Sequence, residues 1–377
     1  MGSRSVRAAV LTRSPDKGPF ASTRPIEIRE LQLDEPGDGE VTVKIHAAGL
    51  CHSDLSVING DRPRPVPIVL GHEAAGEITQ LGAGVSGFEV GDRVVLAFVP
   101  SCGECDPCLS GRAALCEPGA VANAAGTLAS GERRWGGDEG EMLHHHLGIS
   151  AFAEQTIVSQ LSAIKIPDDL PYDVACLFGC AVLTGVGAAL NAAAIEPGHT
   201  VAVFGLGGVG LAAVMGAKLA GAGRVIAVDP VAHKRQLALD LGADEVLSGA
   251  SGTVEQLRAL TDGGPDRVIE TAGSVAVLEM AYLATRRGGT TVTVGLPNPE
   301  ALLSIPAATL VAEERTLKGS YLGSANPSEM LPKLFDFWRA GKLPVERLIT
   351  GRLTLEEINE GFDRLASGEA IRQIVVP

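Results

Sequence analysis

The sequence predicts an α/β protein in two parts, one rich in β-strands and one built on a doubly wound parallel sheet. Short β-branched runs broken by Gly and Asp fill residues 41–100, as expected for a compact β region. From about residue 200, strand-like runs alternate with helical ones, which is typical of a parallel sheet. The chain has 377 residues, of which 45% are hydrophobic, so it can hold two domains with a large core.

The β-rich part comes first along the chain. Strand-like segments cover residues 40–50, 73–82 and 91–99, and a cysteine-rich loop at 102–116 follows them. Residues 117–141 are rich in Gly, and we expect them to be irregular.

Residues 174–190 form the most membrane-like segment. The segment is just short of a normal span, is rich in Gly and Ala, and lacks basic flanks. We therefore expect a buried helix and no membrane partner.

The second part begins with a strand at 201–204, a Gly-rich turn, an apolar helix and a strand that ends at Asp229. The later elements are strands at 266–273 and 290–297, helices at 274–286, 327–343 and 354–367, and a final strand at 370–377.

Charge and cysteine usage restrict the partners and the compartment. The formal net charge is −14 and no dense Lys/Arg run is present, which argues against binding to nucleic acid or to an anionic membrane surface. Seven cysteines, an odd number, and an N-terminus without a long apolar run favour a reducing compartment, so we expect a cytoplasmic protein.

The Gly-rich turn predicts a dinucleotide site. Gly205, Gly207 and Gly210 follow the G-x-G-x-x-G pattern directly after a strand and at the start of a helix. That context assigns the glycines to the tight turn, to the approach of the pyrophosphate and to helix–sheet packing, as in a Rossmann domain. Asp229 stands nineteen residues after Gly210, where a carboxylate binds ribose hydroxyls and repels a 2′-phosphate, so NAD is favoured over NADP.

Four cysteines in one loop predict a metal site. Cys102, Cys105, Cys108 and Cys116 follow C-x2-C-x2-C-x7-C. An iron–sulfur run of the ferredoxin type would need a shorter last gap, and disulfides between cysteines three apart would be strained. Four thiolates satisfy tetrahedral Zn²⁺ and leave no open position, so this zinc is expected to be structural.

Three residues far apart in the sequence are candidates for a second zinc site. Two Cys and one His, namely Cys51, His72 and Cys180, could supply the three protein ligands of a catalytic zinc. The same residues could equally be buried core residues, because free Cys is commonly buried.

Several motifs together resemble the medium-chain, zinc-dependent alcohol dehydrogenases. GLCHSD, GHEAAG, the four-cysteine loop, FGC with a following TG, and VFGLGGVG with a following VD occur in the family's order, and the resemblance covers nearly the whole chain. It is greatest to the animal-type branch. The resemblance implies a GroES-like catalytic domain at 1–181 with a zinc lobe at 100–118, a Rossmann NAD-binding domain at 182–321, and a return of 322–377 to the catalytic domain.

The resemblance also implies roles for individual residues. Cys51, His72 and Cys180 match the catalytic zinc ligands, Glu73 a nearby carboxylate, and Asp54 the partner of His72. Ser53 matches the hydroxyl that receives the alcohol proton. Cofactor contacts match His52, Thr184, Gly205, Gly207, Gly208, Val209, Gly210, Asp229, Lys234 and Arg372. An apolar substrate pocket is implied at Phe98, His146, Leu147, Leu296 and Tyr321.

The chain departs from the family pattern at two positions. Ser56 stands where many relatives carry the histidine that ends the proton relay, so the relay must end in water, in His52 or in a cofactor hydroxyl. His146 stands where relatives often carry Phe; we interpret the run HHH at 144–146 as a loop with one pocket residue. Cys176 matches no ligand and is expected in the core.

The implied activity is reversible hydride transfer from a zinc-bound primary or secondary alcohol to NAD, giving an aldehyde or a ketone. The cofactors are NAD and two Zn²⁺ per chain, the partner is a small alcohol or aldehyde, and a homodimer would join sheets near residues 301–311. One alternative is a thiol-adduct (S-hydroxymethyl) formaldehyde dehydrogenase, which would need basic pocket residues that we do not identify. The other is a non-enzymatic zinc- or cofactor-binding protein, which would be expected to lack one of the three catalytic ligands.

Overall fold

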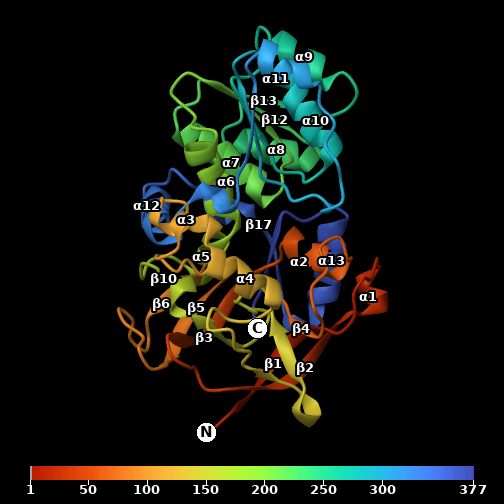
Figure 1. The fold of residues 1–377 in the computed structure, drawn as a ribbon. Helices are drawn as coiled ribbons and strands as arrows, with labels where there is room; N and C mark the ends of the chain where they lie inside the picture. The colour runs from red at the N-terminus through yellow and green to blue at the C-terminus, as the bar shows by residue number, and fades with distance from the viewer. Residues whose placement is uncertain (1) are drawn as a thin grey trace. The chain divides into compact units, whose positions relative to one another are not determined.

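The chain forms two compact units in the computed structural model, which describes residues 2–377 (Figure 1). Unit 1 contains the chain up to Cys180 together with Asn326–Asp336 and Val345–Pro377, and unit 2 contains Ala181–Ala325 and Phe337–Pro344. These units are defined by compactness alone, so the limits of the catalytic and NAD-binding domains given above stay predictions.

A seven-stranded sheet forms the centre of unit 1, with the order β10-β6-β5-β3-β18-β17 and with β9 also paired to β3. The strand β3 pairs antiparallel with β5, β9 and β18, so the last strand of the chain lies beside one of the first. The strands are β3 (Glu40–Gly49), β5 (Ala74–Leu81), β6 (Arg93–Leu96), β9 (Gln155–Ser159), β10 (Ala163–Lys165), β17 (Ile349–Leu353) and β18 (Arg372–Val375).

A closed barrel forms the second sheet of unit 1, in the order β1-β2-β7-β8-β4. Alternating Val6, Ala8 and Val10 pack into a buried cluster around Trp135, as the two-residue period of a strand requires. The strands are β1 (Arg4–Leu11), β2 (Ile26–Leu33), β4 (Ile68–Val69), β7 (Trp135–Gly136) and β8 (Met142–His145).

Two of the helices of unit 1 that the sequence did not predict lie close to candidate site residues. The helix α2 (His52–Ile58) interrupts the β region immediately after Cys51. The helix α4 (Glu117–Ala125) occupies the start of the stretch expected to be irregular. Its Ala-rich sequence begins with a proline in the first turn and ends at Gly126 in the left-handed conformation, which are start and stop signals that the Gly content obscured. The other helices assigned to this unit are α1 (Phe20–Thr23), α3 (Asp106–Leu109), α5 (Tyr172–Ala175) and α13 (Ile358–Ala366).

Unit 2 is built on six parallel strands in the order β13-β12-β11-β14-β15-β16, which confirms the predicted doubly wound sheet. The order reverses between β11 and β14, the position at which such sheets bind ligands. The strands are β11 (Thr200–Phe204), β12 (Arg224–Val228), β13 (Glu245–Leu247), β14 (Arg267–Glu270), β15 (Thr290–Thr293) and β16 (Thr316–Gly319).

Helices pack on this sheet, and the buried core contains residues from both the helices and the strands, such as Phe204 and Val268 of the strands. Within unit 2 they are α6 (Ala181–Gly187), α7 (Gly208–Leu219), α8 (Ala232–Asp240), α9 (Thr253–Leu260), α10 (Val275–Ala284) and α11 (Ala307–Ala312); α12 (Pro327–Arg339) begins in unit 1 and ends in unit 2.

The membrane-like segment is buried, as predicted, but it is not one continuous helix. Residues 174–189 are buried, and the helical path is interrupted at Cys180, whose φ and ψ are −138° and −75°. Among the described residues, no single helix is long and apolar enough to cross a bilayer. The bent pair of helical segments Tyr172–Gly179 and Ala181–Ala192 is together long and apolar enough to cross a bilayer, by length and composition alone.

Candidate active site

Three potential metal ligands from distant segments of unit 1 meet in one buried cluster. Cys51 stands between β3 and α2, His72 between β4 and β5, and Cys180 follows a 3-10 turn at Cys176–Gly179. Their ligand atoms all lie within 4.8 Å of one another, and Cys180 Sγ lies 3.5 Å from His72 Nε2. None of the three is more than 6% exposed, so the cluster is shielded from solvent.

Glycines let these ligand segments approach one another, and our sequence analysis did not single them out. A Cβ on Gly179, next to Cys180, would lie 2.2 Å from the carbonyl oxygen of Leu96. Gly71, next to His72, has φ +94°, and a Cβ there would lie 2.6 Å from the amide nitrogen of Phe152. Only glycine fits either position. The sequence does contain a signal for this close packing, because a glycine directly precedes each of two candidate ligands.

A buried carboxylate orients the candidate ligand His72. Asp54 Oδ1 accepts hydrogen bonds from His72 Nδ1 at 3.1 Å and from the Gly71 amide at 3.1 Å. The same oxygen lies 3.0 Å from His146 Nδ1. Burial alone would raise the pKa of Asp54, but the two imidazoles hold it at about 2, so the group is a carboxylate. Because Nδ1 of His72 is occupied, Nε2 is the atom left to face the thiols.

The ionisation of the three candidate ligands suits a divalent cation. The pKa of Cys51 lies well below its usual value because Cys180 donates a hydrogen bond to its thiolate, and the pKa of Cys180 is raised well above for the same reason. Burial lowers the pKa of His72, but Asp54 and Cys51 raise it well above its usual value. A metal would replace these protons, because metal ligands are deprotonated. Two Cys and one His are a known ligand set for catalytic zinc, so the residues fit the ion.

Glu73 and Arg372 form a buried pair beside the cluster. Arg372 Nε lies 3.6 Å from Glu73 Oε1, both side chains are at most 3% exposed, and Arg372 Nη1 donates to the Leu50 carbonyl at 3.0 Å. A Cβ on Gly49 would lie 2.3 Å from Glu73 Oε1, so Gly49 leaves room for that carboxylate. The structure therefore places Arg372, expected to contact a cofactor pyrophosphate, against Glu73.

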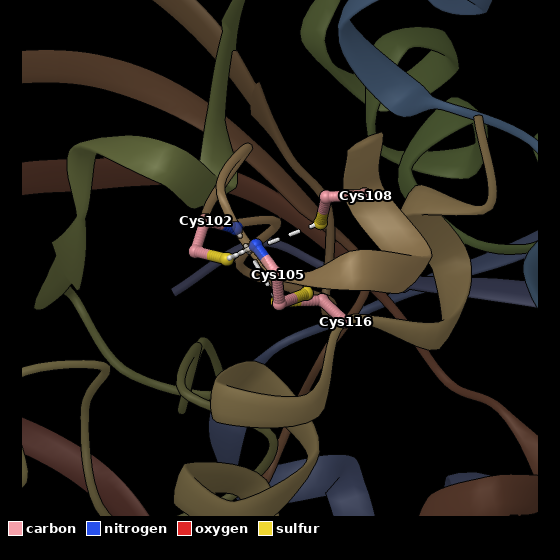
Figure 2. Close-up of side chains that lie close together, drawn as sticks. All are labelled: Cys102, Cys105, Cys108 and Cys116. Carbon is pink, nitrogen blue, oxygen red and sulfur yellow. Dashed lines mark hydrogen bonds between the residues drawn. The ribbon is translucent and has the colours of Figure 1, made fainter. Parts of the chain in front are cut away.

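The four lobe cysteines come together as the spacing predicted (Figure 2). Their sulfurs lie within 4.8 Å of one another, and Cys102 Sγ and Cys108 Sγ are 4.0 Å apart. A tetrahedral zinc with Zn–S bonds of about 2.3 Å separates its sulfurs by about 3.8 Å, so the donor set fits this ion. Within the described residues, none of the seven cysteines forms a disulfide.

Backbone amides already favour a thiolate in this lobe. The amides of Glu104 and Cys105 both donate to Cys102 Sγ at 3.4 Å. These bonds lower the pKa of Cys102 to about 7, whereas burial raises the pKa of Cys108 to about 12. The backbone of the lobe therefore favours the thiolate form at Cys102.

The Gly-rich turn of unit 2 has the geometry of a phosphate-binding turn. Gly205 has φ +84°, α7 begins at Gly208, and a Cβ on Gly210 would lie 1.8 Å from the carbonyl oxygen of Gly205. Asp229 Oδ2 accepts from the Leu206 amide at 2.8 Å, which ties the end of β12 to the turn. The start of α7 thus lies beside the Asp229 carboxylate, and a helix N-terminus favours a phosphate group.

The other predicted cofactor residues are placed on neighbouring helices. Thr184 on α6 and Lys234 on α8 are buried within the fold. A Cβ on Gly185 would lie 2.2 Å from the carbonyl oxygen of Val209, so α6 and α7 are closely packed next to the turn. His52 and Arg372 belong to unit 1, where His52 is an exposed residue of α2.

The proton-relay positions differ in their surroundings. Ser53 is half-buried, whereas the hydroxyl of Ser56 donates to the carbonyl of His52 at 2.8 Å, one helical turn earlier. Cys176 is fully buried, its thiol donates to the Asp173 carbonyl at 3.2 Å, and burial raises its pKa well above the usual value. Cys176 lies outside the three-ligand cluster.

The predicted pocket residues divide between the two units. In unit 1, Phe98 packs edge-on against the His72 ring at 5.5 Å between centroids, and Leu147 is 7% exposed. His146 is buried against Asp54. Leu296 and Tyr321 belong to unit 2.

Comparison with known proteins identifies the family. Residues 37–168 match the model described as the alcohol dehydrogenase GroES-like domain, and residues 208–339 match the model described as zinc-binding dehydrogenase. The chain therefore belongs to the medium-chain, zinc-dependent alcohol dehydrogenase family.

Individual relatives cover almost the whole chain. It is 42% identical to the NDMA-dependent alcohol dehydrogenase of Amycolatopsis methanolica, over 94% of this chain and 96% of that protein. A solved alcohol dehydrogenase zinc-binding domain protein from Burkholderia ambifaria matches with a TM-score of 0.93 and 34% identity over 100% of both chains. Benzyl alcohol dehydrogenase from Acinetobacter calcoaceticus matches with a TM-score of 0.91 and 30% identity over 99% of both chains.

We predict that Cys105→Ser lowers the metal content of the purified protein from two zincs per chain to one and lowers its melting temperature. Loss of one thiolate opens the closed lobe site, which stabilises an otherwise irregular loop. Metal analysis checks the result, with Cys176→Ala as the control that should keep two zincs. Two zincs in Cys105→Ser would refute the assignment of the lobe.

We predict that Gly179→Ala impairs zinc binding at the three-ligand cluster and leaves the lobe zinc in place. The new methyl group would clash with the Leu96 carbonyl. Such overpacking lowers the free energy of unfolding by about 1–3 kcal/mol, and the backbone shift that relieves the clash would displace Cys180. Gly319→Ala is the matched control, because a Cβ there meets nothing within 4 Å. Full zinc occupancy and unchanged stability in Gly179→Ala would contradict the role of backbone crowding.

Proposed function

We propose that this protein is an NAD-dependent zinc alcohol dehydrogenase that catalyses reversible hydride transfer between a primary or secondary alcohol and the nicotinamide. The observation that carries the proposal is the convergence of Cys51, His72 and Cys180 into one buried cluster. The Gly-rich turn tied to Asp229 in unit 2 supports a dinucleotide. Membership of the alcohol dehydrogenase family supports the reaction class.

Cys51, His72 and Cys180 would hold the catalytic zinc, and the four lobe cysteines would hold the structural one. The catalytic ion supplies Lewis acidity that makes the alcohol a stronger acid. Asp54 fixes the tautomer and direction of His72. Phe98 covers one edge of the His72 ring and helps to exclude water.

The protein's own hydroxyl moves the proton. We propose that the Ser53 hydroxyl accepts the alcohol proton and releases its own. Its half-buried position on α2 is compatible with transfer of that second proton to solvent. Ser56 cannot donate elsewhere while its hydroxyl is bonded to the His52 carbonyl. The relay therefore ends in water, in a cofactor hydroxyl or in the exposed His52.

NAD is the cofactor that the turn favours. The Asp229 carboxylate accepts from the Leu206 and Val231 amides, which fixes a negative charge where a 2′-phosphate would have to lie. The nearby basic residue Arg235 donates Nη1 to the carbonyls of Asp229 and Pro230. That guanidinium nitrogen is thereby already engaged with backbone oxygens.

The substrate is proposed to be a medium-sized alcohol, aromatic or with a polar tip. The solved benzyl alcohol dehydrogenase of Acinetobacter supports the aromatic choice. The formaldehyde dehydrogenase alternative is not favoured, because the comparisons give alcohol dehydrogenases.

We also propose a homodimer, a cytoplasmic location and membership of the animal-type branch. The edge strand β16 follows a segment in which Leu302 and Val311 are 88% and 82% exposed, which suits pairing with a second copy. The absence of a disulfide among the seven cysteines, all within the described residues, suits a reducing compartment. The relatives described above are bacterial, so the branch stays a prediction.

A panel of alcohols tests the proposal, with the reduction of NAD⁺ followed by absorbance and with NDMA as a second acceptor, because one relative is named for it. We predict turnover of at least one alcohol by the wild type and none by Cys51→Ala. NADH binding should persist in Cys51→Ala, since the cofactor turn lies in unit 2. Alcohol oxidation by a Cys51→Ala sample shown to lack the second zinc would sink the proposal.

We predict that Asp229→Asn narrows the preference for NAD over NADP by about tenfold or more, because one charge-assisted hydrogen bond contributes roughly 1.5–3 kcal/mol. The amide can still accept from one of the two backbone amides, so the turn should persist. The measurement is kcat/KM for both cofactors, with Glu255→Gln as a control for loss of an exposed charge. Equal use of NADP⁺ by the wild type would contradict the cofactor assignment from the outset.

We predict that Ser53→Ala lowers alcohol oxidation by about 10²–10⁴-fold, the usual contribution of positioned proton transfer. Ser56→Ala should have little effect, because the Ser56 hydroxyl is bonded to the backbone of its own helix. Turnover with a deuterated alcohol checks that hydride transfer is being measured. Equal damage by the two substitutions would make Ser56 a relay member and contradict this account.

A further inference from the structure

We propose that His146 is a positioning residue for the candidate catalytic metal, acting through Asp54 on the ligand His72. The proposal rests on the proposed function, because it takes His72 as a zinc ligand. It adds a second role to the expectation that His146 is a wall of the substrate pocket.

Two imidazole nitrogens contact one carboxylate oxygen: His72 Nδ1 is hydrogen-bonded to Asp54 Oδ1, whereas His146 Nδ1 contacts the same oxygen outside hydrogen-bond alignment. Asp54 Oδ1 lies 3.1 Å from His72 Nδ1 and 3.0 Å from His146 Nδ1. The three side chains are at most 2% exposed. The two imidazoles meet edge to face, with 5.4 Å between centroids and 83° between planes. One carboxylate oxygen thus faces two ring nitrogens that approach it from different directions.

The second imidazole restricts the carboxylate. The other oxygen, Asp54 Oδ2, is buried and has no hydrogen-bond partner among the described residues, so no hydrogen bond on that side restrains rotation about the Cβ–Cγ bond. His146 and the Gly71 amide supply the opposing contacts on Oδ1. Fixing the carboxylate fixes the ring of His72, since orientation of a histidine ligand depends on its outer partner.

The loop that carries His146 is built to hold it. The strand β8 ends at His145, and the amide of His146 donates to Ser150 Oγ at 2.9 Å. Ser150 Oγ in turn donates to the Val69 carbonyl of β4 at 2.8 Å. Leu147 and Ser150 have φ values of 52° and 53°, a backbone conformation that non-glycine residues keep only when their surroundings enforce it.

The test compares His146→Phe, which keeps an aromatic ring but removes the nitrogen that contacts Asp54, with His146→Asn, whose side-chain amide can reach the position of Nδ1. The measurements are the rate of zinc loss to a chelator from each site and the visible spectrum of protein carrying cobalt at the three-ligand site. The lobe zinc is an internal reference. His144→Phe is the matched control, because His144 lies on β8 two residues earlier and outside the cluster.

We expect His146→Phe to speed zinc loss from the three-ligand site by about 3- to 10-fold, less than the ~10–100-fold typical when a direct partner of a metal ligand is lost. The cobalt spectrum should shift, and the lobe zinc should be unaffected. His146→Asn and His144→Phe should stay within about twofold of the wild type, whereas Asp54→Ala should show the full effect of losing the direct partner.

An unchanged rate and spectrum in His146→Phe, alongside a clear effect of Asp54→Ala, would overturn the proposal for His146 alone. Equal damage by His146→Phe and His146→Asn would also overturn it, because ring packing would then be the cause. A wild-type protein without a second zinc would instead overturn the proposed function.

Discussion

Backbone crowding around the candidate metal ligands is the constraint on which the buried cluster of unit 1 depends. Gly71 and Gly179 stand directly before His72 and Cys180, and each brings its backbone closer to a neighbouring segment than any Cβ would permit. The positions of the ligand-bearing segments are consequently fixed by close packing of the main chain. A site fixed in this way can present two thiols and an imidazole to an ion without paying further ordering entropy on binding.

Charge compensation forms a second layer around the same cluster. The buried carboxylate of Asp54 faces two imidazoles, and the buried Glu73 lies beside the guanidinium of Arg372. Burying such groups is unfavourable unless each is paired. The pairs therefore hold one another in place, and the arrangement joins β18 at the end of the chain to β3 and α2 near its beginning.

The sequence predicted what local patterns encode. The strand–turn–helix around Gly205, the spacing of the lobe cysteines and the burial of residues 174–189 depend on nearby residues and are seen in the structure. Contacts between distant segments were less accessible: spacing could not show that Cys51, His72 and Cys180 converge, and only the resemblance suggested it. The closed barrel, the contact of His146 with Asp54 and the buried pairing of Arg372 with Glu73 arise from tertiary packing, which residue type and period do not report.

Transfer of deuterium from alcohol to cofactor is the measurement that tests the central claim most directly. A benzyl alcohol deuterated at the reacting carbon would be oxidised in one turnover with NAD⁺, and the cofactor analysed by mass spectrometry. The account predicts that the deuterium moves to the nicotinamide of NADH, because hydride passes directly between the two carbons. Aldehyde formation with the deuterium released to water would contradict it.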